Sequence, residues 1–102
     1  QALMMIDMDY FKQINDTYGH ATGDQVLKIF AGFLKEQFRA TDIIGRVGGD
    51  EFMILMKNVR LDYSIHLHLQ KLYTNLQNID IPELNDQNLS CSIGCAVPPT
   101  HA

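Results

Sequence analysis

The sequence predicts a single α+β domain whose elements follow the order β-α-β-β-α-β. Two segments carry apolar residues at helical spacing, and four apolar runs are too short to be helices. A pair of glycines at residues 48–49 predicts a reversal of the chain between the second and third runs. A length of 102 residues suits one domain with a modest core.

Composition and charge exclude several classes of protein. Hydrophobic residues make up 46% of the chain and charged residues 20%, which is ordinary for a globular fold and not for a disordered segment. The net charge of -4 argues against direct binding of nucleic acid, which needs a basic face. No apolar run approaches the roughly 20 residues that span a bilayer, and no signal-peptide pattern is present. The chain opens at Gln1 directly into an apolar run, so we expect residues 1–102 to be one partial domain, cut at both ends, of a longer protein.

The first strand is predicted at residues 2–6, an apolar run that ends in the acidic residues Asp7 and Asp9. Residues 11–22 are predicted to be a polar connector rich in turns, because asparagine, aspartate and glycine interrupt any long helix. The first helix is predicted to begin at residues 23–24. Its apolar side chains keep the 3.6-residue period: Val26, Leu27, Phe30, Phe33, Leu34 and Phe38.

The next two strands form a predicted hairpin. The second strand spans residues 42–47 and the third spans residues 52–56, on either side of Gly48 and Gly49. Paired glycines accept the positive φ angles that two-residue hairpin turns require, so a tight turn is expected here.

The second half of the chain holds one more helix and one more strand. The helix is predicted after Asp62, followed by a loop at residues 81–88. The strand is predicted at residues 89–97, and Pro98 and Pro99 end it. The apolar residues of the helix again keep helical spacing: Ile65, Leu69, Leu72, Tyr73, Leu76 and Ile79.

This order of elements is the split βαβ arrangement of ferredoxin-like folds, with an antiparallel sheet. Its first and third strands are central, adjacent and antiparallel, so the end of the first strand lies beside the start of the third. The topology therefore places Asp7 and Asp9 beside the hairpin tip that carries Asp50 and Glu51.

Two cysteines, Cys91 and Cys95, lie in the fourth predicted strand. Four residues along a strand put them on one face but about 13 Å apart, whereas the Cα atoms of a disulfide lie within about 7 Å. We therefore expect free, buried thiols and a cytoplasmic location. A metal-binding pair is the weaker alternative, because no further CxxC or pair of histidines completes it.

The expected cluster of four carboxylates suggests a cation site. Like charges at strand ends repel, and a bound cation offsets that repulsion. Hard oxygen ligands favour Mg²⁺ or Mn²⁺, and Mg²⁺ takes phosphate oxygens and water as further ligands, which suits phosphoryl or nucleotidyl transfer. The alternative is that Asp7 and Asp9 are solvated strand-end residues and that Asp50 and Glu51 belong to a solvated turn.

Four motifs, in order and with matching spacing, resemble those of the GGDEF-domain diguanylate cyclases. Residues 46–52, Arg-Val-Gly-Gly-Asp-Glu-Phe, match the family's RxGGDEF signature. Residues 7–12 are similar to its DxDxFK motif, residues 15–24 to its NDxxGHxxGD motif, and residues 92–94 to its SIG strand. The resemblance covers essentially the whole chain and implies a ferredoxin-like core similar to nucleotide cyclase and polymerase palm domains.

The resemblance implies an activity and its catalytic residues. The activity is condensation of two GTP molecules into cyclic di-GMP with release of pyrophosphate. It implies a homodimer, because each subunit holds one GTP and the two must face each other. Asp7 and Asp50 are the implied ligands of Mg²⁺ or Mn²⁺, with the carbonyl oxygen of Met8 as a further ligand. Asp50 and Glu51 are the implied catalytic residues, Glu51 by activating the 3′-hydroxyl or holding a second metal.

The resemblance also implies a substrate site. Guanine would be recognised by two side chains, the phosphates would lie near a backbone segment and a lysine, and two glycines would let the backbone approach the nucleotide. In that order, these residues are Asn15 and Asp24, Phe11 and Lys12, and Gly48 and Gly49. The alternatives are that Asn15 is a turn residue, that Asp24 caps the following helix, and that Lys12 is a solvated charge.

A separate motif, Arg39-Ala40-Thr41-Asp42, has the spacing of the family's RxxD inhibitory site, with five residues between Asp42 and Gly48. The resemblance implies that Arg39 and Asp42 bind cyclic di-GMP and damp further synthesis. An arginine pairs with phosphate or a guanine edge, and an aspartate accepts hydrogen bonds from guanine. The alternative is an arginine favoured by a helix C-terminus and followed by a loop aspartate.

The chain departs from the family at its ends. The helix that normally opens the domain, and the final helix and strand that contribute to the triphosphate site, have no counterpart in residues 1–102. A non-catalytic module that binds GTP or cyclic di-GMP, or a structural or dimerisation fragment, is therefore the alternative to an active cyclase. For the parent protein we expect a sensory or receiver domain before this one, and its membrane anchoring is left open.

Overall fold

The computed structural model describes residues 2–57, 63–84 and 88–96. The elements follow one another as β1 (Ala2–Met8), α1 (Phe11–Tyr18), α2 (His20–Gln37), β2 (Ile43–Arg46), β3 (Glu51–Met56), α3 (Tyr63–Gln77), a short 3₁₀ turn (Pro82–Leu84) and β4 (Cys91–Ala96). No helix in these ranges is long and apolar enough to cross a membrane.

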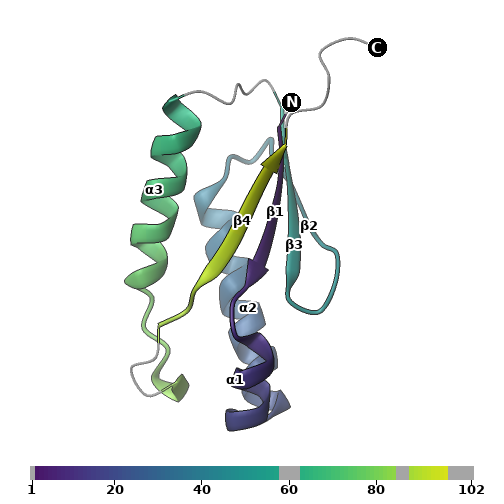
Figure 1. Cartoon of the computed structure of the whole chain (residues 1–102), viewed down its shortest axis with the longest axis vertical. Helices are drawn as coiled ribbons and strands as arrows, with labels where there is room; N and C mark the ends of the chain where they lie inside the picture. Colours follow the sequence, from purple (N-terminus) through teal and green to yellow (C-terminus); the bar gives the residue numbers. More distant parts are fainter. Residues whose placement is uncertain (1, 58–62, 85–87, 97–102) are drawn as a thin grey trace.

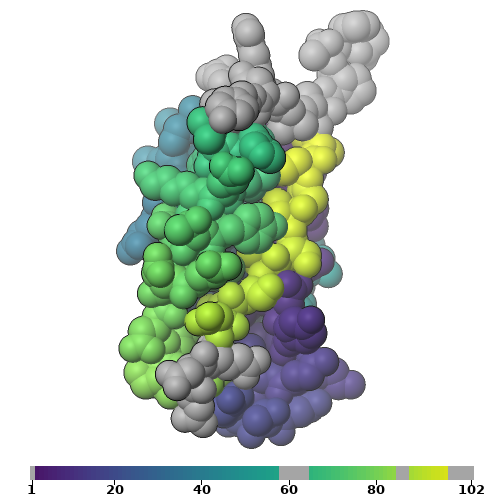
Figure 2. Space-filling view, turned by 60° about the vertical axis from the view of Figure 1, so that its left-hand side comes forward, coloured from purple at the N-terminus to yellow at the C-terminus, as the bar shows by residue number. Residues whose placement is uncertain are grey.

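The four strands form one antiparallel sheet in the order β2-β3-β1-β4. The two central strands are thus β1 and β3, as predicted, and Asp7 lies opposite Glu51. Helices α2 and α3 lie on the same face of the sheet (Figure 1), and α3 packs along β4 (Figure 2). The predicted α+β fold with an antiparallel sheet is confirmed.

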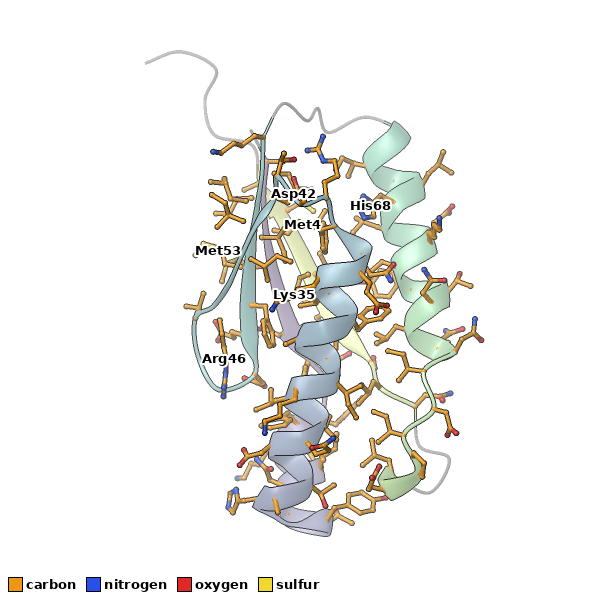
Figure 3. The ribbon with its side chains drawn as sticks, turned by 180° about the vertical axis from the view of Figure 1, so that it is seen from behind. Met4, Lys35, Asp42, Arg46, Met53 and His68 are labelled. Carbon is orange, nitrogen blue, oxygen red and sulfur yellow. The ribbon has the colours of Figure 1, made fainter. Side chains whose placement is uncertain are left out.

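The core lies between the helices and one face of the sheet. Alternate residues of β1 are buried, as the period of a half-covered strand requires. Met4 lies on the helix side of the sheet and Met53 on the opposite side (Figure 3). From α2, Phe30 is fully buried and its ring meets that of Phe52 edge-on at 5.5 Å. This packing holds α2 against the central strand β3.

The connector predicted at residues 11–22 is wrong, because most of it is helical. Phe11, Ile14 and Tyr18 fall on one face at helical spacing and pack against the core, while most of the polar residues between them are exposed. Gly19, with φ of +93°, separates α1 from α2, a backbone angle that glycine accepts at little cost. Helix α2 therefore begins at His20 and not at residues 23–24.

Other predicted boundaries shift by a few residues. Strands β2 and β4 are shorter than predicted, β3 begins one residue earlier, and α2 and α3 end before Phe38 and Ile79. A 3₁₀ turn lies in the predicted loop. The thiols are free, as expected, but only Cys91 is buried; Cys95 lies near the edge-strand terminus and is exposed. Asp62 and the proline pair at residues 98–99 lie outside the described residues.

Candidate functional site

The end of β1 and the start of β3 form the centre of the candidate site. Asp7 and Glu51 are directly opposite in the antiparallel register, so their side chains leave the same face of the sheet, away from the helices. The backbone N–H of Met8 donates to the carbonyl of Asp50 at 3.1 Å, which ties the hairpin to the end of β1. The predicted neighbourhood of Asp7, Asp50 and Glu51 in the backbone is therefore confirmed.

Asp9 is held apart from these residues by β4. Its two carboxylate oxygens accept hydrogen bonds from the hydroxyls of Ser90 at 2.6 Å and Ser92 at 2.7 Å. Its backbone N–H donates to the carbonyl of Ser90 at 2.8 Å. Asp9 is thus a structural link between β1 and β4, a role that is not evident from the sequence.

The predicted cluster of four carboxylates is wrong as a ready-made metal cage. Within residues 2–57, 63–84 and 88–96, no group of three or more His, Cys, Asp or Glu side chains could hold a metal ion. The physical reason is that the two serines turn Asp9 toward β4. A Mg²⁺ ion, however, is usually held by one or two carboxylates, with waters and phosphate oxygens as its other ligands. Asp7 and Asp50 still fit that pattern.

Asp7 is available for such a role. Its side chain is exposed, and no hydrogen bond or ion pair to it occurs in the described part of the chain. Asp50 and Glu51 are half-buried beside it in the hairpin. A carboxylate left without a protein partner at the end of a central strand can bind a cation without first breaking a protein contact.

The hairpin is organised by Arg46, a residue for which the sequence predicts no separate role. Its guanidinium donates from Nε to the carbonyl of Gly48 at 3.0 Å, and from Nη2 to the carbonyl of Gly49 at 2.9 Å. Val47 N–H donates to the carbonyl of Glu51 at 2.9 Å and closes the loop. The position of an arginine two residues before the glycines is the signal in the sequence that points to this contact.

The tight turn predicted at Gly48 and Gly49 is wrong in detail. Strand β2 ends at Arg46 and β3 begins at Glu51, so the connection is longer than two residues. Neither glycine has a positive φ. A Cβ on Gly49 would meet no atom within 4 Å, and one on Gly48 would meet only the Cβ of Glu51 at 3.9 Å. Open space, not backbone strain, is what the glycines leave here.

Helices α1 and α2 bring the other candidate residues together. Asn15 lies inside α1, and its side chain faces Gly23 of α2 so closely that a Cβ on Gly23 would lie 1.7 Å from Asn15 Oδ1. Asp24 follows Gly23 and is exposed. Because α2 begins at His20, Asp24 is inside the helix, and its alternative interpretation as the helix cap is wrong. At the start of α1, Phe11 packs partly against the core and Lys12 is exposed.

A hollow of about 480 Å³ extends from Asp24 along the side of α2 that faces β2 and β3. Lys35 and Arg46 project on this side of the molecule (Figure 3). The floor is apolar and the rim carries cations, and the lining residues are Asp24, Leu27, Lys28, Ala31, Lys35, Ile44, Arg46 and Phe52. A ring system with attached anionic groups would suit such a lining.

The Arg39–Asp42 motif lies at the other end of the sheet, where α2 leads into β2. Asp42 has a side-chain exposure of 1% and accepts hydrogen bonds from the Arg39 backbone at 2.8 Å and from Arg39 Nη2 at 3.0 Å. The same Nη2 donates to the carbonyl of Lys57 at 2.8 Å. The two residues that the sequence placed in an inhibitory site are therefore paired with each other, while the Arg39 side chain remains 52% exposed.

Burial raises the pKa values of both thiols of β4, and a nearby negative charge raises one of them further. Burial, and then the negative charge of Asp9, raise the pKa of Cys91 to about 12. Burial raises the pKa of Cys95 above its usual value. On α3, burial and the nearby Cys91 and Asp9 raise the pKa of Tyr73. These groups stay protonated near neutral pH, so the thiols are not activated nucleophiles.

The sequence matches the family model described as "Diguanylate cyclase, GGDEF domain" over residues 1–102. The chain belongs to the GGDEF-domain family of diguanylate cyclases. It is 36% identical over 94 residues to the probable diguanylate cyclase DgcC of Escherichia coli, covering 92% of this chain and 25% of that protein. It is 40% identical over 92 residues to YhcK of Bacillus subtilis, an uncharacterised protein, covering 90% of this chain and 25% of that one.

Solved GGDEF domains have the same fold. The GGDEF domain of YfiN (also called TpbB) from Pseudomonas aeruginosa has a TM-score of 0.85 and 35% identity, covering 99% of this chain and 63% of that one. The GGDEF domain of DgcB from Caulobacter crescentus, solved in complex with cyclic di-GMP, has a TM-score of 0.79 and 26% identity, covering 92% of this chain and 57% of that one. The chain spans about a quarter of the length of the curated relatives above.

Membership of the GGDEF family implies a requirement for a divalent metal. Hard carboxylate oxygens at the end of β1 and in the hairpin are the donor chemistry that such a metal prefers. The family's signature motif coincides with the hairpin that Arg46 closes and that the Met8–Asp50 hydrogen bond ties to β1.

Proposed function

We propose that this chain provides the catalytic centre of a diguanylate cyclase, which condenses two GTP molecules into cyclic di-GMP and pyrophosphate. One observation carries the proposal: the antiparallel register that brings Asp7 opposite Glu51 and joins Asp50 to Met8, in a chain matched throughout by the GGDEF family. An alternative, a domain that binds nucleotide without turnover, is disfavoured because the signature residues are all present.

The divalent metal in this proposal is Mg²⁺ or Mn²⁺, held by Asp7 and Asp50 with the carbonyl oxygen of Met8. When bound, the metal neutralises phosphate charge and lowers the pKa of an attacking hydroxyl. Glu51, half-buried beside Asp50, accepts the proton of the 3′-hydroxyl or holds a second metal. The exposed and unpaired state of Asp7 in the described structure supports this assignment, because a cation there displaces no existing contact.

The nucleotide in this proposal lies between the hairpin and the helices. Asn15 and Asp24 recognise the guanine edge; the carboxylate of Asp24 accepts from the N1–H and amino group, which adenine does not offer as a pair. Lys12 and the backbone at Phe11 lie near the phosphates. The open space around Gly48 and Gly49 admits the nucleotide to the hairpin. Each subunit holds one GTP, so two copies must face each other for the bonds to form.

Product regulation is the second part of this proposal. Arg39 and Asp42 bind cyclic di-GMP and slow its synthesis. The solved complex of the similar DgcB domain with cyclic di-GMP supports binding of this ligand. The half-exposed guanidinium of Arg39 supports the location, because that group can turn from Asp42 toward a ligand phosphate.

The test uses a polypeptide that contains residues 1–102, incubated with GTP and Mg²⁺ and assayed for cyclic di-GMP by chromatography. The unchanged protein should form cyclic di-GMP and pyrophosphate, and Asp50→Ala should form none. Absence of product from the unchanged protein, or equal product from Asp50→Ala, would overturn the catalytic proposal. Nucleotide binding is measured separately by calorimetry, so that a binding module without turnover is recognised.

A further inference from the structure

The contact between α1 and α2 has almost no space to spare. A Cβ built on Gly23 would lie 1.7 Å from Oδ1, 2.9 Å from Cγ and 3.6 Å from Nδ2 of Asn15. Real Cβ atoms essentially never come within 3.0 Å of another residue's heavy atom. The carboxamide of Asn15 therefore occupies the place that any side chain at position 23 would take.

Backbone conformation does not explain this glycine. Gly23 is buried in the second turn of α2 and does not have a positive φ, so its backbone would accept alanine. Glycine inside a helix costs about 1 kcal/mol relative to alanine. Gly32, in the same helix, is exposed, and a Cβ there would meet nothing within 4 Å. Only Gly23 makes room for another side chain.

The side chain that fills this room is one of the two proposed guanine-recognising groups. Asn15 comes from α1, and Asp24, the other group, directly follows Gly23 in α2. The contact at Gly23 therefore sets how far the Asn15 carboxamide lies from the start of α2. If residue 23 carried a side chain, Asn15 would have to move by more than an ångström.

We propose that Gly23 is a positioning residue for nucleotide recognition: it holds the Asn15 carboxamide where, together with Asp24, it meets the N1–H and amino group of a guanine nucleotide. The proposal rests on the proposed function, because the ligand is the GTP of that site. It adds a residue that touches no nucleotide and acts through Asn15.

The experiment compares Gly23→Ala with Gly32→Ala as the matched control from the same helix. Binding of GTP and of inosine triphosphate, which lacks the 2-amino group, is measured by calorimetry in a polypeptide that contains residues 1–102. Gly23→Ala should weaken GTP binding about tenfold or more and reduce the preference for GTP over inosine triphosphate. Gly32→Ala should leave both quantities unchanged. A role in packing alone would not alter the preference between the two nucleotides.

A double variant separates positioning from folding. Asn15→Ala removes the atoms that a Cβ at position 23 would meet, so adding Gly23→Ala to Asn15→Ala should cause no further loss of binding. If Gly23→Ala alone does not fold, the double variant should restore the fold. The inference is overturned if Gly23→Ala keeps normal affinity and preference, or if its effect is undiminished without the Asn15 side chain. Failure of the unchanged protein to bind GTP would instead overturn the proposed function, and the inference with it.

Discussion

Asp7 and Asp42, at opposite ends of the β-sheet, have carboxylates in opposite states. At the end formed by β1 and β3, Asp7 is exposed and lies opposite Glu51, and its carboxylate has no hydrogen-bond partner in the described part of the chain. At the end where α2 leads into β2, Asp42 is almost completely buried and is paired with Arg39. Asp42 and Arg46 mark these two ends in Figure 3.

The buried Asp42 stabilises the fold, whereas Asp7 and Glu51 repel each other and destabilise it. Like charges directly opposite on neighbouring strands are destabilising, so Asp7 and Glu51 cost stability until a cation joins them. A buried carboxylate with charge-assisted hydrogen bonds contributes stability, and removing its partner leaves an uncompensated charge. Substitutions at the two ends should therefore change stability in opposite directions.

The largest expected effect is on activity, at the end of the sheet where the Asp7 carboxylate is unpaired (the unpaired end). Asp7→Asn should reduce formation of cyclic di-GMP by at least about 10²-fold, because metal-assisted stabilisation of the transition state is worth several kcal/mol. The free energy of unfolding without added metal should stay equal or rise, because a repulsion is removed. Product formation and urea unfolding are the two measurements.

Asp80→Asn is the control for Asp7→Asn, since Asp80 is also exposed but lies after α3. It should change neither quantity. A clear loss of stability in Asp7→Asn would contradict the comparison, because it would show that Asp7 makes a stabilising contact.

The largest expected effect on stability is at the end of the sheet where Asp42 is paired with Arg39 (the paired end). Asp42→Ala should lower the free energy of unfolding by about 1.5–3 kcal/mol, the range for hydrogen bonds to a charged group. The substitution leaves the Arg39 backbone N–H without its acceptor and the guanidinium without its carboxylate partner, although Nη2 still donates to the carbonyl of Lys57. Urea unfolding measures the loss. Equal stability of Asp42→Ala and the unchanged protein would show that this end is no more structural than the other.

Sequence reasoning was most successful where it depended on topology. The order of the strands and the two apolar helix faces were enough to predict that Asp7 meets the hairpin carrying Glu51. The hydrogen-bond partners of individual side chains could not be predicted in the same way. The spacing of residues does not show that Ser90 and Ser92 donate to Asp9, because that contact depends on the register of β4.

Helix α1 was not predicted for a different reason. Its many polar residues obscure the helical spacing of Phe11, Ile14 and Tyr18, which are the side chains that pack against the core. The contact of Asn15 with Gly23 could not be predicted either, because it requires the packing of α1 on α2. Packing between elements is a three-dimensional property that a period along the chain does not contain.

A comparable effect is expected from the other partner at the paired end. Arg39→Ala should lower the free energy of unfolding by about as much as Asp42→Ala, because it leaves the buried Asp42 carboxylate uncompensated, with the residue 39 backbone N–H as its remaining donor among the described residues. It should also weaken binding of cyclic di-GMP, measured by calorimetry. Unchanged affinity for cyclic di-GMP would remove the inhibitory site from the proposal while leaving the structural role of the pair intact.

The smallest expected effect is on the pH dependence of stability, through the thiols of β4. It shows how far along β4 the negative charge of Asp9 influences a thiol pKa. Cys91, opposite Met8, has its pKa raised from 9.0 to about 12 by burial and then by Asp9, whereas burial alone raises the pKa of Cys95, opposite Met4. At alkaline pH the unfolded chain loses the Cys91 proton first, so the folded state binds more protons. The contribution of Cys91 to stability is therefore complete below about pH 9 and is lost as the pH rises toward 12.

Cys91→Ala, which has no thiol to ionise at position 91, should lose less stability than the unchanged protein between about pH 8 and pH 10, as measured by urea unfolding.

Chemical modification of the two thiols is a second test. Iodoacetamide at pH 8 should modify the exposed Cys95 and leave the buried Cys91 intact. Asp9→Asn should lower the pKa of Cys91 but leave that of Cys95 unchanged, because the charge of Asp9 acts on Cys91 alone of the two. Equal modification rates for both thiols would contradict the burial difference. An equal response of both thiols to Asp9→Asn would show that the carboxylate field extends beyond the end of the sheet.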